Sequence, residues 1–196
     1  MRFPVAAPRI SVAAIGKTIA ATGFTLAAMV FASCADSVDS VYANYRASFN
    51  FTPVTAVSQL HQAVNNPGLF CLVWRDTGQY YFQNAAGSTG TYPVTAADAY
   101  TTWQCLSGFI VGTTNVPDLS SGQLSLVAYD AVCPNCFSES TIQRRLTFAD
   151  EGTAHCTRCD RDYDLNNFGI VTQGGAGRSL FRYRVYYAAD RLVVNN

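Results

Sequence analysis

Charge is scarce in this sequence, and lysine above all: Lys17 is the one lysine among 196 residues, and charged residues make up 13% of the chain. From Cys34 onward, ten arginines stand against thirteen acidic residues, a net charge of −3. No basic run remains to follow a phosphate backbone, which argues against nucleic acid as a partner. The hydrophobic fraction of 49% excludes disorder for most of the chain.

Methionine is also rare, with two residues, whereas tyrosine and phenylalanine number 11 and 12. Aromatic residues favour strands, so this composition indicates a β-rich protein rather than a helical bundle. A long hydrophobic run is missing as well. The apolar stretch at residues 18–32 is too short for an ordinary membrane span, and no second one follows.

The first 34 residues have the pattern of an export signal. Residues 1–17 carry three positive charges and no acid, and residues 18–32 fit the hydrophobic region of a signal peptide. The segment FASC at residues 31–34 resembles the lipobox of bacterial lipoproteins, in which the cysteine is acylated and becomes the new N-terminus. The alternative is ordinary signal-peptidase cleavage nearby, which leaves Cys34 as an odd thiol.

We therefore expect three parts: a lipoprotein signal peptide at 1–33, a polar tether at 34–45 that begins with lipidated Cys34, and a folded domain at 46–196. The predicted location is the outer membrane or cell envelope, with the domain facing the periplasm or the surface. Several acyl chains on one residue suffice for stable membrane anchoring. The compartment is then oxidising, which permits disulfides.

Short strands separated by turn residues dominate the mature chain. The clearest is 180–187, where Phe181, Tyr183, Val185 and Tyr187 share one face. A helix is expected at 57–64 from its apolar spacing, and a second around 96–103. The pattern predicts a single antiparallel β domain. Its strands are expected at 46–51, 69–75, 79–82, 105–111, 124–129, 144–148, 180–187 and 191–194.

Two C-x-x-C turns are the strongest indication of a functional site in the sequence. Cys133 and Cys136 form the first, Cys156 and Cys159 the second, and 19 residues separate them. This spacing is typical of a four-sulfur tetrahedral site for zinc or for iron with sulfide. A strand pair within the 19 residues can fold back to close the site. The alternative is that these thiols form disulfides.

Other residues are less informative. Cys71 and Cys105 lie in apolar segments and could form a disulfide that braces the core or remain two buried thiols. His155 precedes Cys156, but strand alternation turns it away from the metal. His61 falls on the apolar stripe of the expected helix at 57–64 and is interpreted as a core or boundary residue. No Ser-His-Asp set can be assembled, so hydrolytic catalysis has no support.

Three segments in order resemble Rieske proteins. The run CTRCDRDYDLNNFG at 156–169 is similar to their second cluster loop, C-x-x-H-G-x-x-F-D-L followed by glycine. The run GGAGRSL at 174–180 resembles the G-P-A-P-x-x-L loop that covers the cluster. The run VAYDAVCP at 127–134 resembles the strand that enters the first loop. The likeness spans roughly residues 105–194 and is strongest to Rieske-like lipoproteins of Gram-negative bacteria.

The resemblance implies a Rieske-like antiparallel β-sandwich with a small two-knuckle subdomain, like a zinc ribbon or rubredoxin, at about 131–178. It places Tyr163 against the site. From its residue type, Asp164 is predicted to cap backbone N–H groups in a turn rather than to act as an acid catalyst. It also implies a covering loop formed by Gly174, Gly175, Ala176 and Gly177. Rieske clusters, however, use two histidine ligands.

The departures from the Rieske pattern concern those two ligands. Cys159 stands at the second histidine position and Asn135 at the first, with Cys136 as the nearby ligand. Gly175 and Gly177 replace the two loop prolines. The resemblance therefore supports a Rieske-like fold for this chain better than it supports the redox chemistry of a Rieske cluster.

Three function classes follow. The first is a non-enzymatic lipoprotein with a structural zinc site at Cys133, Cys136, Cys156 and Cys159, acting as a binding or assembly module for an unknown protein partner. The second is an electron carrier with a [2Fe-2S] cluster, and a metal-free, disulfide-bonded module is a further alternative. The third is a thiol–disulfide protein, which needs a helix N-terminus at its thiolate. Both C-x-x-C turns are expected to follow strands, so this class ranks last. Zinc ranks first because both imidazoles and a twin-arginine export signal are missing.

Overall fold

A computed structural model describes residues 41–196, apart from residues 97, 99, 100 and 120. The chain divides after Ser40 into two units, and the second, Val41–Asn196, carries every element given below. The expected signal peptide and Cys34 lie outside the described residues, so these remain predictions. Within the described part, no helix has both the length and the apolar character needed to cross a membrane.

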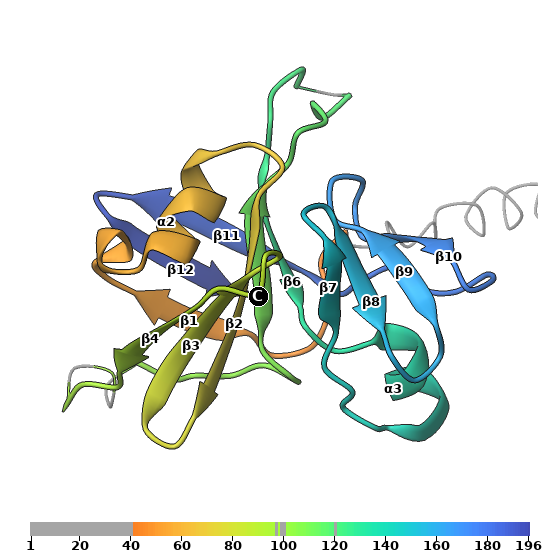
Figure 1. The fold of residues 1–196 in the computed structure, drawn as a ribbon, viewed down its shortest axis with the longest axis horizontal. Helices are drawn as coiled ribbons and strands as arrows, with labels where there is room; N and C mark the ends of the chain where they lie inside the picture. The colour runs from red at the N-terminus through yellow and green to blue at the C-terminus, as the bar shows by residue number, and fades with distance from the viewer. Residues whose placement is uncertain (1–40, 97, 99–100, 120) are drawn as a thin grey trace, which may run out of the picture. The chain divides into compact units, whose positions relative to one another are not determined.

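Eight antiparallel strands form the larger of two sheets (Figure 1). Their order across the sheet is β1-β12-β11-β6-β5-β2-β3-β4, so the first and last strands of the chain are paired near one edge. The strands are β1 (Ser48–Phe51), β2 (Phe70–Asp76), β3 (Gln79–Asn84), β4 (Thr89–Pro93), β5 (Phe109–Thr113), β6 (Leu126–Asp130), β11 (Arg182–Ala188) and β12 (Arg191–Asn195).

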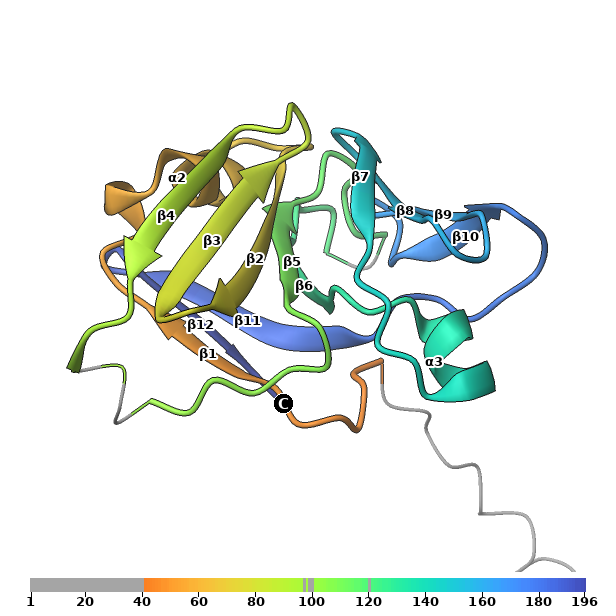
Figure 2. The same cartoon turned by 60° about the horizontal axis from the view of Figure 1, so that its bottom comes forward.

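The sheet curls until its two edge strands share a core. Phe51 of β1 packs against Phe82 of β3 and Tyr92 of β4, with ring centroids 4.9 and 5.1 Å apart. The 3-10 helix η1 (Val54–Ala56) and the helix α2 (Ser58–Asn65) follow β1, and α2 lies against β2 to β5 (Figure 2). Leu60 and Val64 of α2 enter the core, as their spacing predicts.

A smaller antiparallel sheet with the order β10-β9-β8-β7 is inserted between β6 and β11. The inserted segment consists of the helix α3 (Pro134–Ser140) and the four strands of this sheet, β7 (Thr147–Asp150), β8 (Thr153–Cys156), β9 (Arg161–Asp164) and β10 (Ile170–Gln173). The chain leaves the large sheet at Asp130 and returns at Phe181, and Asp130 N donates to Phe181 O at 2.8 Å. The insertion therefore begins and ends at hydrogen-bonded neighbours.

The side chain of Asp130 organises this junction. It is wholly buried and accepts hydrogen bonds from the backbone N–H groups of Leu106, Ser107 and Val132 and from the hydroxyl of Tyr183. Four donors compensate for the burial of a carboxylate, which is costly without partners. Asp130 thus ties the exit of β6 to the segment before β5 and to β11.

A second hydrophobic core joins the two sheets. Phe70, Ile110 and Tyr129 of the large sheet cluster with buried residues of the insertion such as Leu146 and Leu165. The sulfurs of three cysteines, at positions 133, 136 and 156, belong to the same buried cluster. The insertion is therefore packed against the large sheet through an apolar core that includes three of its cysteines.

The prediction of a β-rich, antiparallel fold is confirmed for the described residues. The helix expected at 57–64 is α2, shifted by one residue. The helix expected around 96–103 does not reach its predicted end, because residues 101–103 are not helical; residues 97, 99 and 100 lie outside the described set. Residues 43 and 45, assigned to the tether, contact the domain: Ala43 N donates to Arg182 O at 2.9 Å, and the ring of Tyr45 packs against those of Phe137 and Phe181.

Candidate metal centre

The first C-x-x-C turn opens a helix, which differs from the knuckle expected after a strand. Cys133 is the N-cap of α3, Pro134 takes the first helical position, and Cys136 completes the first turn. Proline suits this position because its fixed φ matches the helix and its missing N–H would have had no partner there. Residues three apart lie on one helical face, so both thiols point the same way.

The second C-x-x-C turn joins β8 to β9. Cys156 is the last residue of β8, and the turn closes with a hydrogen bond from Asp160 N to Cys156 O at 2.9 Å. Asp160 has a φ of 55°, a left-handed conformation that asparagine and aspartate tolerate better than most side chains. Asp160 therefore adopts the left-handed conformation at the position after Cys159, where the Rieske pattern has glycine.

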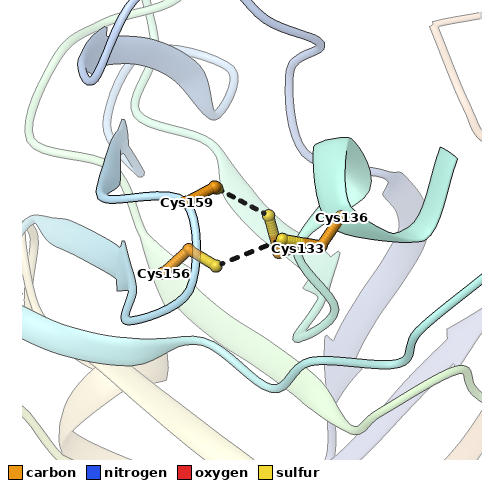
Figure 3. A group of neighbouring side chains, drawn as sticks. All are labelled: Cys133, Cys136, Cys156 and Cys159. Atoms are coloured by element: carbon orange, nitrogen blue, oxygen red, sulfur yellow. Dashed lines mark hydrogen bonds between the residues drawn. The ribbon is translucent and has the colours of Figure 1, made fainter. Parts of the chain in front are cut away.

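The four sulfurs converge on one point (Figure 3). All Sγ atoms of Cys133, Cys136, Cys156 and Cys159 lie within 4.8 Å of one another. Sγ of Cys133 is 3.6 Å from that of Cys159, and Sγ of Cys136 is 3.7 Å from that of Cys156. In a regular tetrahedron with Zn–S bonds of about 2.3 Å, the sulfurs stand about 3.8 Å apart. The donor set and its dimensions fit one tetrahedral metal ion.

Tyr163 of β9 supports the first cysteine. Its ring is wholly buried, and its hydroxyl lies 3.2 Å from Sγ of Cys133. Nδ2 of Asn135 donates to the same hydroxyl at 2.8 Å, which leaves the tyrosine proton to be donated to the sulfur. Hydrogen bonds of this kind orient a ligand and tune the charge it presents to a metal.

Asn135 also holds the loop at residues 174–178. Its Oδ1 accepts from Arg178 N at 2.9 Å, and its Nδ2 donates to Arg178 O at 3.3 Å. A Cβ at Gly177 would lie 2.8 Å from the amide atoms of Asn135, so glycine is required for this approach. Arg161 donates from Nη2 to Ala176 O at 3.2 Å. The loop expected to cover the site is thus bonded to both ligand-bearing segments.

The thiols differ in acidity. Burial raises the pKa of Cys136 and, to a smaller extent, that of Cys156. Burial also acts to raise the pKa of Cys159, but hydrogen bonding by Arg161 and by the neighbouring thiols outweighs it and lowers that pKa to about 7. Metal binding requires thiolates, so a bound cation supplies the charge that lets the buried cysteines ionise.

His155 lies outside the sulfur cluster, and Asp164 caps a turn, as predicted. Nδ1 of His155 lies 2.7 Å from a carboxylate oxygen of Asp162, and His155 is not part of the sulfur cluster. Asp164 accepts from Asn166 N at 2.9 Å and so caps the turn after β9. His61 of α2 is half-buried, consistent with a boundary residue.

The suggested disulfide between Cys71 and Cys105 is wrong for this structure, since both are free thiols, as are the four clustered cysteines. Cys71 pairs with Val111 across the β2–β5 ladder. Cys105 precedes β5 and lines a cleft beside Trp74, at the other end of that ladder. Cys71 is therefore a buried free thiol, the alternative that its apolar surroundings allowed, whereas Cys105 is a partly buried one.

Comparison with family models, with curated proteins and with solved structures finds no match to this chain. Four thiolate ligands would close a tetrahedral coordination sphere and leave no position for water or substrate, which is typical of structural sites.

Asn135 was noted from the sequence only as the residue at the first histidine position of the Rieske pattern, and Arg161 was not singled out. Their supporting roles depend on the fold of the 174–178 loop, which the sequence does not show.

Proposed function

We propose that this chain is a membrane-anchored, Rieske-like lipoprotein of the cell envelope in which a structural zinc ion is held by Cys133, Cys136, Cys156 and Cys159. The protein acts as a non-enzymatic binding or assembly module for another protein. Zinc ties α3 to the β8–β9 turn, and the described surface of the domain serves recognition rather than chemistry.

One observation carries the proposal for the metal: the four sulfurs lie within 4.8 Å of one another. A [2Fe-2S] cluster contains two irons and bridging sulfides, so thiolates on opposite irons must stand further apart than thiolates on one ion. Because every sulfur–sulfur separation among the four cysteines is at most 4.8 Å, the arrangement suits a single ion instead. Zinc also needs no assembly machinery outside the cytoplasm.

Three features support the Rieske-like part of the proposal. The insertion presents two ligand turns, one after β6 and one between β8 and β9. A glycine-rich loop at 174–178 is bonded to both ligand-bearing segments, through Asn135 and Arg161. A final strand pair, β11 and β12, follows this loop. This is the order of parts that the sequence resemblance implies.

The metal is tested on the full chain, purified anaerobically in mild detergent. We expect one zinc per chain by elemental analysis, no visible absorbance, and four thiols that react with alkylating reagents after zinc is chelated. A brown protein with a [2Fe-2S] resonance on reduction would establish electron transfer instead. Metal-free protein whose thiols are all blocked would establish the disulfide-bonded module.

A further inference from the structure

A cavity of about 320 Å³ lies away from the four cysteines. Its walls come from the loop joining β5 to β6, from β6 and β11 of the large sheet, and from the loop after β9. This size falls at the lower end of the range for small-molecule sites. The lining is largely apolar, and its apolar members are Val116, Pro117, Leu119, Val127, Tyr129 and Phe168.

Hydrogen bonds between the walls hold this cavity in shape. The hydroxyl of Tyr129 in β6 donates to Leu165 O at 3.1 Å, which fastens the loop after β9 to the sheet. Asn115 N donates to Oδ1 of Asn166 at 2.9 Å, which fastens the same loop to the β5–β6 loop. A preformed site of this kind loses little conformational freedom when a ligand binds.

Arg182 supplies the positive charge of the cavity. Its guanidinium carbon lies 5.3 Å from the ring centroid of Phe168, another wall residue. Arg182 lines the cavity and, among the described residues, makes no ion pair. Arginine matches carboxylates in geometry and charge. A carboxylate bound in the cavity would give the guanidinium an ion-pair partner.

Two acidic wall residues limit the charge of that ligand. Asp164 accepts from Asn166 N at 2.9 Å, and Asp118 accepts from Ser121 N at 3.2 Å, so each carboxylate holds its own turn. Two negative charges beside one guanidinium repel a polyanion such as a nucleotide. A ligand with one negative charge and an apolar body can pair with Arg182 and contact the apolar walls, and the two carboxylates repel it less than they repel a polyanion.

We infer that this cavity binds a small amphiphilic monocarboxylate, with its carboxylate on Arg182 and its apolar body against the β6 wall. The mouth is apolar too: Leu119 is fully exposed and Phe168 is 47% exposed. This inference goes beyond the proposed zinc function, since none of the four cysteines lines the cavity.

The test uses isothermal titration of the full chain in mild detergent with 3-phenylpropionate, and with the neutral 3-phenylpropanol as a matched probe. We expect saturable binding of one 3-phenylpropionate per chain and binding of the alcohol at least tenfold weaker. Arg182→Met should weaken 3-phenylpropionate at least tenfold and leave the alcohol unchanged. Arg184→Met is the matched control, because Arg184 also packs on Tyr42 but does not line the cavity.

Leu119→Glu provides a second variant at a fully exposed position, where folding is not at stake. The added carboxylate at the mouth should weaken 3-phenylpropionate at least fivefold more than it weakens the alcohol, because only the acid is repelled. Equal affinity for the acid and the alcohol, no saturable binding of the acid, or an equal effect of Arg184→Met would overturn the inference. Zinc is measured in the same samples, so failure here is distinguishable from failure of the metal site.

Discussion

Sγ of Cys133 lies 3.6 Å from Sγ of Cys159, although the two cysteines are 26 positions apart in the chain. The partner contact, between Cys136 and Cys156, likewise joins the first turn to the second. An ion that takes all four thiolates therefore cross-links α3 to the β8–β9 turn. Loss of one ligand should uncouple these segments rather than weaken one turn alone.

Cys156→Ser should abolish stoichiometric zinc binding, with affinity at least a hundredfold weaker, or about 3 kcal/mol. Without the ion, the chain entropy of the insertion is offset by packing alone. We expect limited proteolysis to cleave within residues 133–180 while the strands within residues 69–129 resist. Cys105→Ser removes a free thiol outside the cluster and should retain both zinc and resistance. Uniform resistance of Cys156→Ser would show that packing alone holds the insertion.

Tyr163→Phe should weaken zinc about tenfold, because supporting hydrogen bonds to metal ligands have effects of this size. The ring and its packing stay, and only the contact of the hydroxyl with Cys133 and Asn135 is lost. Competition with a chromogenic chelator measures the change. Tyr129→Phe is the matched control, a buried tyrosine whose hydroxyl donates to Leu165 O. It should cost about 1 kcal/mol of unfolding free energy and leave zinc affinity unchanged.

Asp130→Asn should lower the free energy of unfolding by about 2–3 kcal/mol. The carboxylate accepts from four donors, and an amide places its own N–H groups against some of them. Urea unfolding measures the loss. Asp150→Asn serves for comparison, because Asp150 is exposed and accepts from Gly152 N alone among the described contacts. A change there within about 0.5 kcal/mol is expected, and an equal effect of both variants would contradict the role given to Asp130.

Cys34 should carry the lipid. Mass spectrometry of the membrane fraction should find an acylated N-terminal Cys34, since the charged start, the apolar run and the Ala-Ser-Cys junction form one export pattern. Cys34→Ser should shift the protein to the soluble fraction. Detection of an unmodified N-terminus at another residue would refute the anchor.

Local patterns predicted the centre of most strands but not their limits. The strand expected at 144–148 begins at Thr147 because residues 144–146 bond elsewhere: Cys133 N donates to Arg144 O, and Leu146 N donates to Ala131 O. Strand β4 was missed because Gly90 and Pro93 suggest a turn, and an edge strand tolerates both. Strands β9 and β10 were missed because their charged or short sequences pair only within the folded insertion.

The grouping of the four cysteines could be predicted because each C-x-x-C turn is a local pattern and two such turns typically share one site. The helix that starts at Cys133 was missed, although Pro134 is a recognisable signal for a first helical position. The roles of Asn135 and Arg161 and the cavity beside Arg182 depend on loops far apart in the chain. No single segment carries the information for such contacts.

The hydrogen bond between Asp130 N and Phe181 O has an evolutionary consequence. The insertion leaves and re-enters the large sheet at two hydrogen-bonded residues. For the pairing of β6 with β11, it therefore has the same effect as a tight turn. Its length and content can therefore change by insertion, deletion or exchange without altering the pairing of β6 with β11. Related chains can be expected to diverge most between these two strands, and one that had lost its cysteines would still keep the strand order of the sheet.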